Sequence, residues 1–85
     1  MKDFLDYLIK SIVKNEDAVV IEETLSSDNT CNLSLRVDKE DMGLIIGKEG
    51  KTIKSIRYLL KAKALKEDSR VNLELIDGQP NIEPL

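Results

Sequence analysis

The sequence predicts a small α+β domain whose elements follow the order helix, strand, strand, helix, helix, strand. Three observations support this prediction. Apolar residues near the N-terminus recur at helical spacing, two later segments alternate apolar and polar residues as half-buried strands do, and two glycines three residues apart join a short helical segment to a long one. Of the 85 residues, 41% are apolar and 34% are charged, so the chain can form one domain with a thin core.

The first helix is predicted over residues 3–14. Its apolar residues fall at helical spacing and are Phe4, Leu5, Leu8, Ile9 and Ile12. Asp3 is a suitable N-cap, because a short carboxylate side chain accepts hydrogen bonds from the first free N–H groups of a helix. A polar break at residues 15–17 follows the helix.

Two strands come next, and we expect them to pair as a hairpin. Residues 18–25 are rich in Val and Ile, which favours a strand. Residues 31–37 alternate in polarity, and the apolar residues that share one face are Cys31, Leu33, Leu35 and Val37. The turn-forming residues 26–30 lie between the two strands.

Two helices are predicted after the hairpin. Asp38 opens a short helix that ends at Gly47, and Glu40 and Asp41 place acids in its first turn, where they suit the helix dipole. The second helix covers residues 51–65. Its core face carries Ile53, Ile56 and Leu60. Another face carries Lys51, Lys54, Tyr58 and Lys61, with Arg57 at its edge.

A last strand is predicted over residues 70–76, because Val71, Leu73 and Leu75 alternate with polar residues. Residues 77–80, Asp-Gly-Gln-Pro, stop this strand, and no periodic pattern follows them. We therefore expect residues 1–78 to form a single domain and residues 79–85 to form a short C-terminal tail.

Charge is unevenly distributed along the chain. The net charge is −3, which by itself is unfavourable for binding a polyanion. Residues 43–66, however, contain seven cations and one acid, a local net charge of +6, so the remaining residues sum to −9. Such a basic patch on an acidic body is typical of a nucleic-acid contact, although a solvated helix face has the same composition.

Composition narrows the class of function. The chain has no histidine and a single cysteine, Cys31, so it lacks the usual general base and the commonest metal ligand and cannot form an internal disulfide. We expect neither an enzyme nor a bound metal or cofactor, and we interpret Asp38, Glu40 and Asp41 as charges at a helix start. No segment reaches the roughly 18 to 20 apolar residues that cross a bilayer, so we expect a cytoplasmic protein without a membrane partner.

The most informative segment is residues 44–53, Leu-Ile-Ile-Gly-Lys-Glu-Gly-Lys-Thr-Ile. Gly47 and Gly50 are each followed by a lysine. Glycine lets backbone N–H groups approach a ligand closely, and the turn opens a helix whose N-terminus carries unpaired N–H groups and partial positive charge. The segment is therefore suited to contact a phosphate group.

This segment resembles the I-I-G-x-x-G-x-x-I signature of the KH domain. The element order resembles the bacterial, type II form, in which a helix and a strand precede the β-α-α-β core, and the chain is similar to the small single-domain KH proteins of the KhpA type over residues 2–77. The resemblance implies an α-β-β-α-α-β fold, with three helices packed on one face of a three-stranded mixed sheet. It also implies that about four nucleotides of single-stranded RNA lie in a narrow cleft.

The resemblance also implies which residues meet the RNA. The helix pair and its GxxG loop would form one wall of the cleft, and the strand at residues 31–37 with the variable loop at 26–30 would form the other. The loop would contact the sugar-phosphate backbone, with the isoleucines forming the floor or lying behind it. The residues predicted to bind RNA are Ile45, Ile46, Gly47, Lys48, Glu49, Gly50, Lys51, Ile53, Lys54 and Arg57.

Glu49 departs from the expected pattern, because it places a carboxylate in a loop that should face phosphates. We expect its side chain to point to solvent and to pair with a nearby lysine. A carboxylate turned toward the RNA costs about 0.5–1 kcal/mol at an exposed site, which Lys48 and Lys51 should outweigh. The three aromatic residues are too few for a stacking platform on the strands, so base contacts should come from apolar side chains and backbone groups.

Two functions are therefore predicted. The first is a cytoplasmic protein that captures short single-stranded RNA, as an RNA chaperone or post-transcriptional regulator. The second is a protein–protein adaptor whose helix pair is a dimer interface and whose contact with RNA is minor. The resemblance implies, as partners, a second copy of the chain or a larger KH-containing protein of the Jag (KhpB) type, and a link to cell elongation and division.

Overall fold

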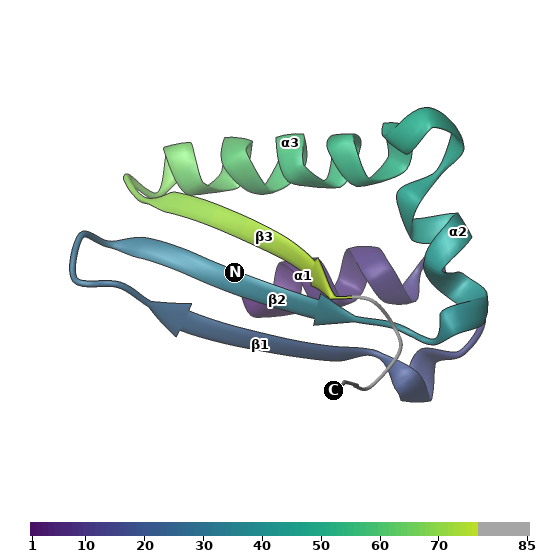
Figure 1. Ribbon diagram of the computed structural model, residues 1–85. Helices are drawn as coiled ribbons and strands as arrows, with labels where there is room; N and C mark the ends of the chain where they lie inside the picture. The colour runs from purple at the N-terminus through teal and green to yellow at the C-terminus, as the bar shows by residue number, and fades with distance from the viewer. Residues whose placement is uncertain (77–85) are drawn as a thin grey trace, which may run out of the picture.

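Figure 1 shows a computed structural model of the protein, which describes residues 1–76. The helices and strands are α1 (Lys2–Lys10), β1 (Val20–Leu25), β2 (Thr30–Arg36), α2 (Met42–Ile46), α3 (Lys51–Lys66) and β3 (Arg70–Ile76). Short 3-10 turns cover Glu16–Ala18, Lys39–Asp41 and Lys48–Gly50. The predicted α+β class and element order are confirmed. The predicted stop at residues 77–80, the domain end at 78 and the tail at 79–85 lie outside the described residues.

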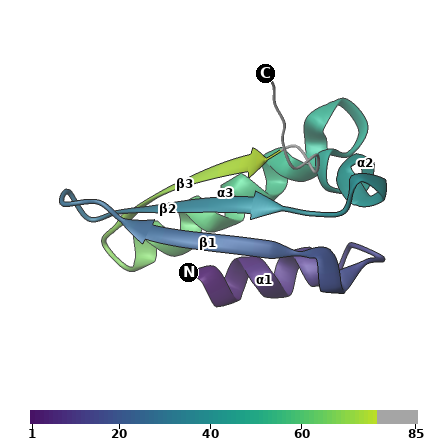
Figure 2. The same ribbon diagram turned by 60° about the horizontal axis from the view of Figure 1, so that its bottom comes forward.

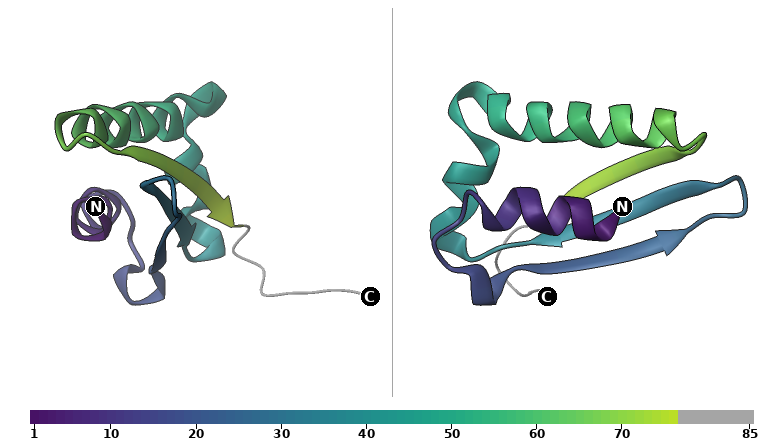
Figure 3. Two further views of the ribbon diagram at one scale, coloured as in Figure 1. Left: turned by 90° about the vertical axis from the view of Figure 1, so that its left-hand side faces the viewer. Right: turned by 180° about the vertical axis from the view of Figure 1, so that it is seen from behind.

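The strands form a mixed sheet in the order β1-β2-β3. The predicted hairpin is present: β1 pairs antiparallel with β2, and Ile21 lies opposite Leu35. Strands β2 and β3 run parallel, with Leu33 beside Leu73, because the α2–α3 unit carries the chain back to the start of the sheet. Figures 2 and 3 show α1 and α3 on the same side of the sheet, while α2 lies at the end where β2 finishes.

The core lies between this face of the sheet and the helices. In β2 and the residue after it, the predicted alternation is reproduced, because Cys31, Leu33, Leu35 and Val37 are all buried. The helices contribute the buried residues Leu5, Ile9, Ile45, Ile53, Ile56 and Leu60. Each element buries one face in the same small core, so the position of the α2–α3 turn is fixed by packing on both sides of it.

Helix α1 is shorter than predicted, and its N-terminus differs as well. It ends at Lys10 instead of residue 14, and the N-cap position is Met1, so Asp3 lies inside the first turn. The chain leaves the helix at Ser11, whose hydroxyl donates to the Tyr7 carbonyl at 2.7 Å. The N–H groups of Ile12 and Val13 still donate to the Ile9 carbonyl, both at 3.0 Å. Those of Lys14 and Asn15 find partners outside the helix, which the apolar periodicity of the sequence does not reveal.

Asp41 supplies these partners. Its carboxylate is completely buried and accepts hydrogen bonds from the backbone N–H groups of Lys14 (3.1 Å) and Asn15 (3.0 Å) and from Asn15 Nδ2 (3.1 Å). Burial acts to raise the pKa of Asp41, but the hydrogen bonds from Asn15 and Lys14 outweigh it and hold the pKa below its ordinary value. The predicted role of a helix-start charge is therefore incomplete, because this residue also fastens the α1–β1 connection to the start of α2.

Candidate nucleic-acid interface

The turn between α2 and α3 is built by two glycines with different backbone conformations. Helix α2 ends at Gly47, which has φ 76° and ψ 173° and donates its N–H to the Gly43 carbonyl at 2.9 Å. Gly50, at φ 75° and ψ 14°, is left-handed and precedes α3, and its N–H donates to the Gly47 carbonyl at 3.1 Å. Glu49 is left-handed as well, at φ 57°. The turn is thus tight and defined, and it presents its backbone at the start of a 16-residue helix.

The two glycines are needed for different reasons. A Cβ atom on Gly47 would overlap Thr52 Oγ1 and lie 2.6 Å from Thr52 Cβ and 2.8 Å from Thr52 N, so no side chain fits there. A Cβ on Gly50 would meet nothing closer than Lys54 Cε at 3.9 Å, so only its positive φ favours glycine. Gly47 therefore allows α3 to pack directly against the end of α2.

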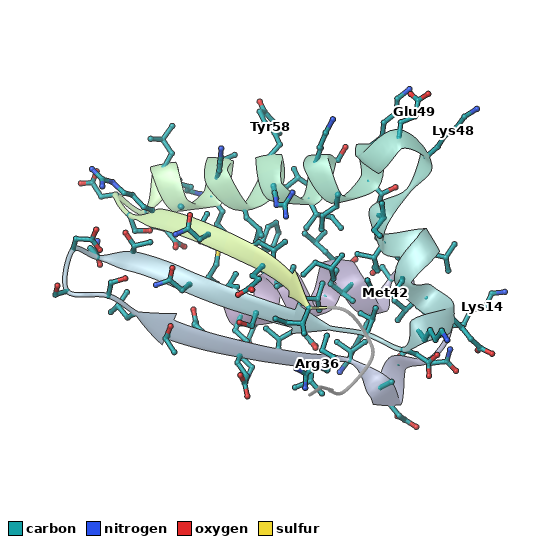
Figure 4. All side chains as sticks on the ribbon, in the orientation of Figure 1. Lys14, Arg36, Met42, Lys48, Glu49 and Tyr58 are labelled. Carbon is teal, nitrogen blue, oxygen red and sulfur yellow. The ribbon has the colours of Figure 1, made fainter. Side chains whose placement is uncertain are left out.

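Charged side chains surround the tip of the turn. Figure 4 shows Lys48 and Glu49 projecting from the tip, away from the sheet. Glu49 Oε1 lies 4.0 Å from Lys51 Nζ, and both side chains are about three-quarters exposed, so this pair is weak. Glu49 points to solvent and pairs with a lysine, as predicted. Within residues 1–76, Lys48 takes part in no ion pair.

A stripe of three cations continues from the turn along α3. Lys54, Arg57 and Lys61 follow one another at spacings of three and four, which places them on one side of a helix. All three are exposed, and none of them pairs with an acid within the described residues. We call these three residues the α3 stripe. It gives the α2–α3 unit a continuous positive edge.

The α3 stripe borders a pocket of about 250 Å³ between α3 and β3. Arg57, Leu60 and Lys61 line one wall, and Val71, Asn72 and Leu73 line the other. The sequence predicted residues 31–37 for the second wall. That strand is instead the middle strand of the sheet, so β3 separates it from α3, and this part of the prediction is wrong. Parallel pairing of β2 with the last strand is a long-range contact that alternation alone does not indicate.

The predicted variable loop lies at the far end of the sheet from the turn (Figure 1). Asn29 connects it to the start of β3, because its carbonyl accepts the Arg70 N–H at 3.4 Å and its side-chain amide donates to the Asp68 carbonyl at 3.2 Å. The loop therefore supports the second wall of the pocket at the end opposite the glycine turn.

The three isoleucines predicted at the cleft differ in accessibility. Ile45 and Ile53 are core residues, exposed by 0% and 7% respectively, and thus lie behind the turn. Ile46 is 39% exposed, and Leu44, which the sequence did not single out, is 42% exposed. These two side chains form the accessible apolar surface of α2.

The structure adds pocket residues that the sequence did not assign to the site: Leu60, Lys61, Val71, Asn72 and Leu73. Lys61 was recognisable, because it follows Arg57 by four residues on a helix. The β3 residues were not, because their place beside α3 follows from the sheet order. Tyr58 points outward from α3 in Figure 4 and is 71% exposed.

Other candidate sites have structural explanations. The Cys31 thiol donates to Glu23 Oε2 at 2.9 Å, and burial, together with this carboxylate, raises the pKa of Cys31 to about 11. The thiol is therefore protonated at neutral pH and packs as a small apolar group, as predicted.

Within residues 1–76, no group of three or more His, Cys, Asp or Glu side chains is arranged so that it could hold a metal ion. The same residues include no helix with the length and apolar character needed to cross a membrane.

The chain is similar to known proteins over most of its length. The sequence model of the family described as "KhpA/KhpB, KH domain" matches residues 2–75. The RNA-binding protein KhpA of Chlamydia caviae is 46% identical over 79 residues, which are 93% of this chain and 100% of the relative. The RNA-binding protein KhpA of Clostridium acetobutylicum is 42% identical over 76 residues, 89% of this chain and 100% of the relative. The RNA-binding protein KhpA of Borreliella burgdorferi is 37% identical over 75 residues, which are 88% of this chain and 90% of the relative.

Proposed function

The chain belongs to the KhpA/KhpB family of KH domains, and on this premise we propose that it binds short single-stranded RNA at the Gly47–Gly50 turn and along the groove between α3 and β3. The observation that carries the proposal is the continuity of the surface. The half-buried glycine turn with its exposed Lys48 leads into the α3 stripe, and Arg57 and Lys61 of this stripe line a pocket with apolar walls.

The turn is suited to hold the sugar-phosphate backbone. Backbone N–H groups at the start of α3 carry partial positive charge, and the absence of a side chain at Gly50, where a Cβ would meet nothing closer than 3.9 Å, leaves room for close approach. Lys48 adds a full charge at the tip, and the α3 stripe adds three more along the path. The local +6 of residues 43–66 therefore acts on the RNA although the whole chain is −3.

The pocket is suited to hold a base. Leu60, Val71 and Leu73 offer apolar surface, and Asn72 offers a polar group. A planar base can therefore bury its faces against apolar side chains and still form a hydrogen bond at its edge. Only a few phosphates are contacted by one copy, so we propose weak binding with modest sequence preference.

Replacing Lys48 by Asp tests this proposal, with Lys2→Asp as the matched control. Both substitutions change the charge by the same amount at an exposed position, but Lys2 lies in the first turn of α1, away from the turn. We expect Lys48→Asp to weaken binding of a labelled eight-nucleotide RNA at least about tenfold and Lys2→Asp to change it less than about twofold. Equal affinities of parent and Lys48→Asp, with both folds intact by circular dichroism, would contradict the assignment.

Salt provides a second test that does not depend on a variant. If Z phosphates are neutralised, log K falls with log salt at a slope of about −0.7Z for a single strand. Contacts from Lys48 and the α3 stripe predict a slope near −2 to −3, and Lys48→Asp should reduce its magnitude by about one phosphate equivalent. An affinity that is flat between 50 and about 200 mM salt speaks against phosphate contacts.

The cellular role that we propose is that of an RNA chaperone or post-transcriptional regulator in the cytoplasm. Weak, sequence-tolerant capture of single strands suits such a role, and a buried protonated thiol is compatible with a reducing compartment. A link to cell elongation and division rests on the family resemblance. Deleting the gene and complementing the deletion with Lys48→Asp tests that link. If the variant restores normal cell length, the link to cell elongation does not depend on RNA binding.

A second candidate function is a protein–protein adaptor, favoured by apolar side chains on the outer side of α3. Tyr58, Leu59 and Leu65 are 71%, 43% and 80% exposed, a large apolar content for the solvent side of a charged helix. The partner would be a second copy or a larger KH-containing protein of the Jag (KhpB) type. Sedimentation of the parent and of Leu59→Asp tests this function: loss of a dimer with unchanged RNA affinity supports an adaptor, and a monomeric parent at high concentration excludes self-pairing.

A further inference from the structure

Strand β1 forms an edge of the sheet along which no helix or strand of residues 1–76 lies. The sheet order is β1-β2-β3, so β2 covers only one side of β1. Figures 1 and 3 show α1 against a face of the sheet, and they show no neighbouring helix or strand along the outer side of β1. Apart from Ile21, every residue of β1 is exposed. The edge is therefore accessible to a segment of another molecule.

The turn of the hairpin determines which backbone groups of β1 are free. The Ser26 N–H donates to the Thr30 carbonyl at 2.8 Å. Backbone groups alternate in direction along an antiparallel strand, so residues 20, 22 and 24 direct theirs to β2, while Ile21, Glu23 and Leu25 direct theirs outward. Within residues 1–76, no other backbone group bonds to these outward groups. Such a row of free N–H groups and carbonyls is what an added strand pairs with in β-augmentation.

Charge is the feature of β1 that protects this edge. All six residues pair with β2 in unbroken register, so the strand has no bulge, and it contains no proline. Glu22 and Glu23 lie at its centre, on opposite faces of the sheet. Within residues 1–76, Glu22 forms no ion pair, whereas Glu23 Oε2 accepts the Cys31 thiol at 2.9 Å and lies 3.8 Å from the amino group of Met1. The two glutamates therefore decide what can pair with β1.

These glutamates disfavour a second copy of the chain as the occupant. Two copies of β1 can exchange backbone hydrogen bonds only where the outward-facing residues of one oppose those of the other. In the two longest antiparallel registers of this kind, Glu22 or Glu23 lies directly opposite its own counterpart, and like charges in that position are destabilising. Residues 77–85 contain two acids, two prolines and no cation, so their sequence is unsuited to this edge as well.

We propose that the edge of β1 binds an extended segment of another protein that carries lysine or arginine opposite Glu22 and Glu23. Val20 and Leu25, exposed by 48% and 71%, lie at the two ends of β1 and favour apolar residues at the ends of the added segment. The proposal does not depend on RNA binding. The groove beside α3 adjoins β3, at the opposite edge of the sheet, so a basic protein segment and an RNA can bind at the same time.

Two short peptides with blocked ends test this proposal on the whole chain, labelled for NMR spectroscopy. The basic peptide is Val-Thr-Lys-Lys-Thr-Val, and its control is Val-Thr-Glu-Glu-Thr-Val. Each sequence reads the same in both directions, so neither presupposes parallel or antiparallel addition. We expect the basic peptide to slow hydrogen exchange at the amides of Ile21, Glu23 and Leu25. It should bind at least about threefold more tightly than the control, because two cross-strand charge pairs differ in sign.

A charge reversal on each edge of the sheet locates the contact. Glu22→Lys should weaken binding of the basic peptide at least about threefold and tighten binding of the acidic one. Glu74→Lys is the matched control, because Glu74 is exposed on the same face of the sheet and is in register with Glu22 across Ser34, but lies on β3. It should change either affinity less than about twofold at physiological salt, which screens charges at that separation.

Several outcomes overturn the proposal. These are equal binding of the two peptides by the parent, no binding of the basic peptide at millimolar concentration, exchange effects concentrated outside β1, and equal weakening by Glu22→Lys and Glu74→Lys. If the amides of Ile21, Glu23 and Leu25 become protected on raising the protein concentration alone, a second copy is the occupant instead. If they are protected in the whole chain and lose this protection when residues 77–85 are removed, that segment is the occupant instead.

Discussion

The glycine turn makes a prediction that distinguishes its two glycines. In Gly47→Ala, the new methyl group meets both the side chain and the backbone nitrogen of Thr52, and φ is 76°. A strained backbone costs about 1–3 kcal/mol, and overpacking against atoms that cannot withdraw adds about 1–3 kcal/mol. We expect a loss of about 2–6 kcal/mol in the free energy of unfolding, a large part of the roughly 5–15 kcal/mol that a small domain has.

Gly50→Ala should be milder. Its Cβ is 3.9 Å from the nearest side-chain atom, Lys54 Cε, so only the left-handed backbone contributes, at about 1–2 kcal/mol. Asn tolerates this conformation better than Ala, so Gly50→Asn should cost less than Gly50→Ala, whereas Gly47→Asn should remain severe because the collision with Thr52 persists.

Urea denaturation followed by far-UV circular dichroism measures the four variants against the parent. Parallel binding curves with labelled RNA show whether a folded Gly50→Asn protein still binds. If Gly47→Ala and Gly50→Ala lose the same free energy within about 0.5 kcal/mol, or if Gly47→Asn is as mild as Gly50→Asn, the steric argument about Thr52 is refuted.

Three further predictions follow from single residues. Asp41→Asn should lower the melting temperature, because the amide cannot accept all the hydrogen bonds from Lys14 and Asn15. Since the folded pKa of Asp41 lies below its ordinary value of 3.8, the difference from the parent should be full above about pH 4 and shrink as the pH falls further, and a pH-independent difference would contradict the role of the carboxylate. Glu49→Gln and Glu49→Asn should both tighten RNA binding about two- to fivefold by removing a like charge, but only Asn, which tolerates the left-handed φ of 57°, should also raise the urea midpoint. The Cys31 thiol, with its pKa raised to about 11, should react with Ellman's reagent at pH 8 far more slowly in the folded protein than in urea. Because the unfolded thiol ionises near 9, the parent should also lose stability between pH 9 and 11 relative to Cys31→Ala, and rapid labelling of the native thiol would contradict its burial.

The sequence was sufficient to predict the elements whose structure depends on residues close to one another in the chain. Alternation over 31–37 and 70–76 identified both strands, because one face of each is turned toward the core and the other toward solvent. The end of α2 was predicted from Gly47, whose backbone conformation other residues rarely adopt. The charged turn was recognised from the same glycines and the lysines beside them.

The sequence was insufficient to predict features that depend on contacts between distant parts of the chain. The path of the chain after α1 depends on Asp41, 26 residues beyond Asn15, and no residue near Lys10 indicates this contact. The wall of the pocket depends on which strand lies at the edge of the sheet, and this follows from the parallel pairing of β2 with β3. The motif left open whether Ile45 and Ile53 form the floor of the cleft or lie behind it, and their burial places them behind it, in the core.

Within residues 1–76, the strand that completes the groove, β3, is the last element to be made. Translation makes the α2–α3 turn some 20 residues before β3 is available, so a nascent chain can present the basic edge without a cavity beside it. The pocket beside α3 is therefore complete only after β3 has been made, and a chain that stops before Arg70 should lack it while its basic edge still attracts polyanions. An RNA bound in the groove contacts both α3 and β3, so it should stabilise the folded domain, and this stabilisation should rise with the logarithm of the RNA concentration.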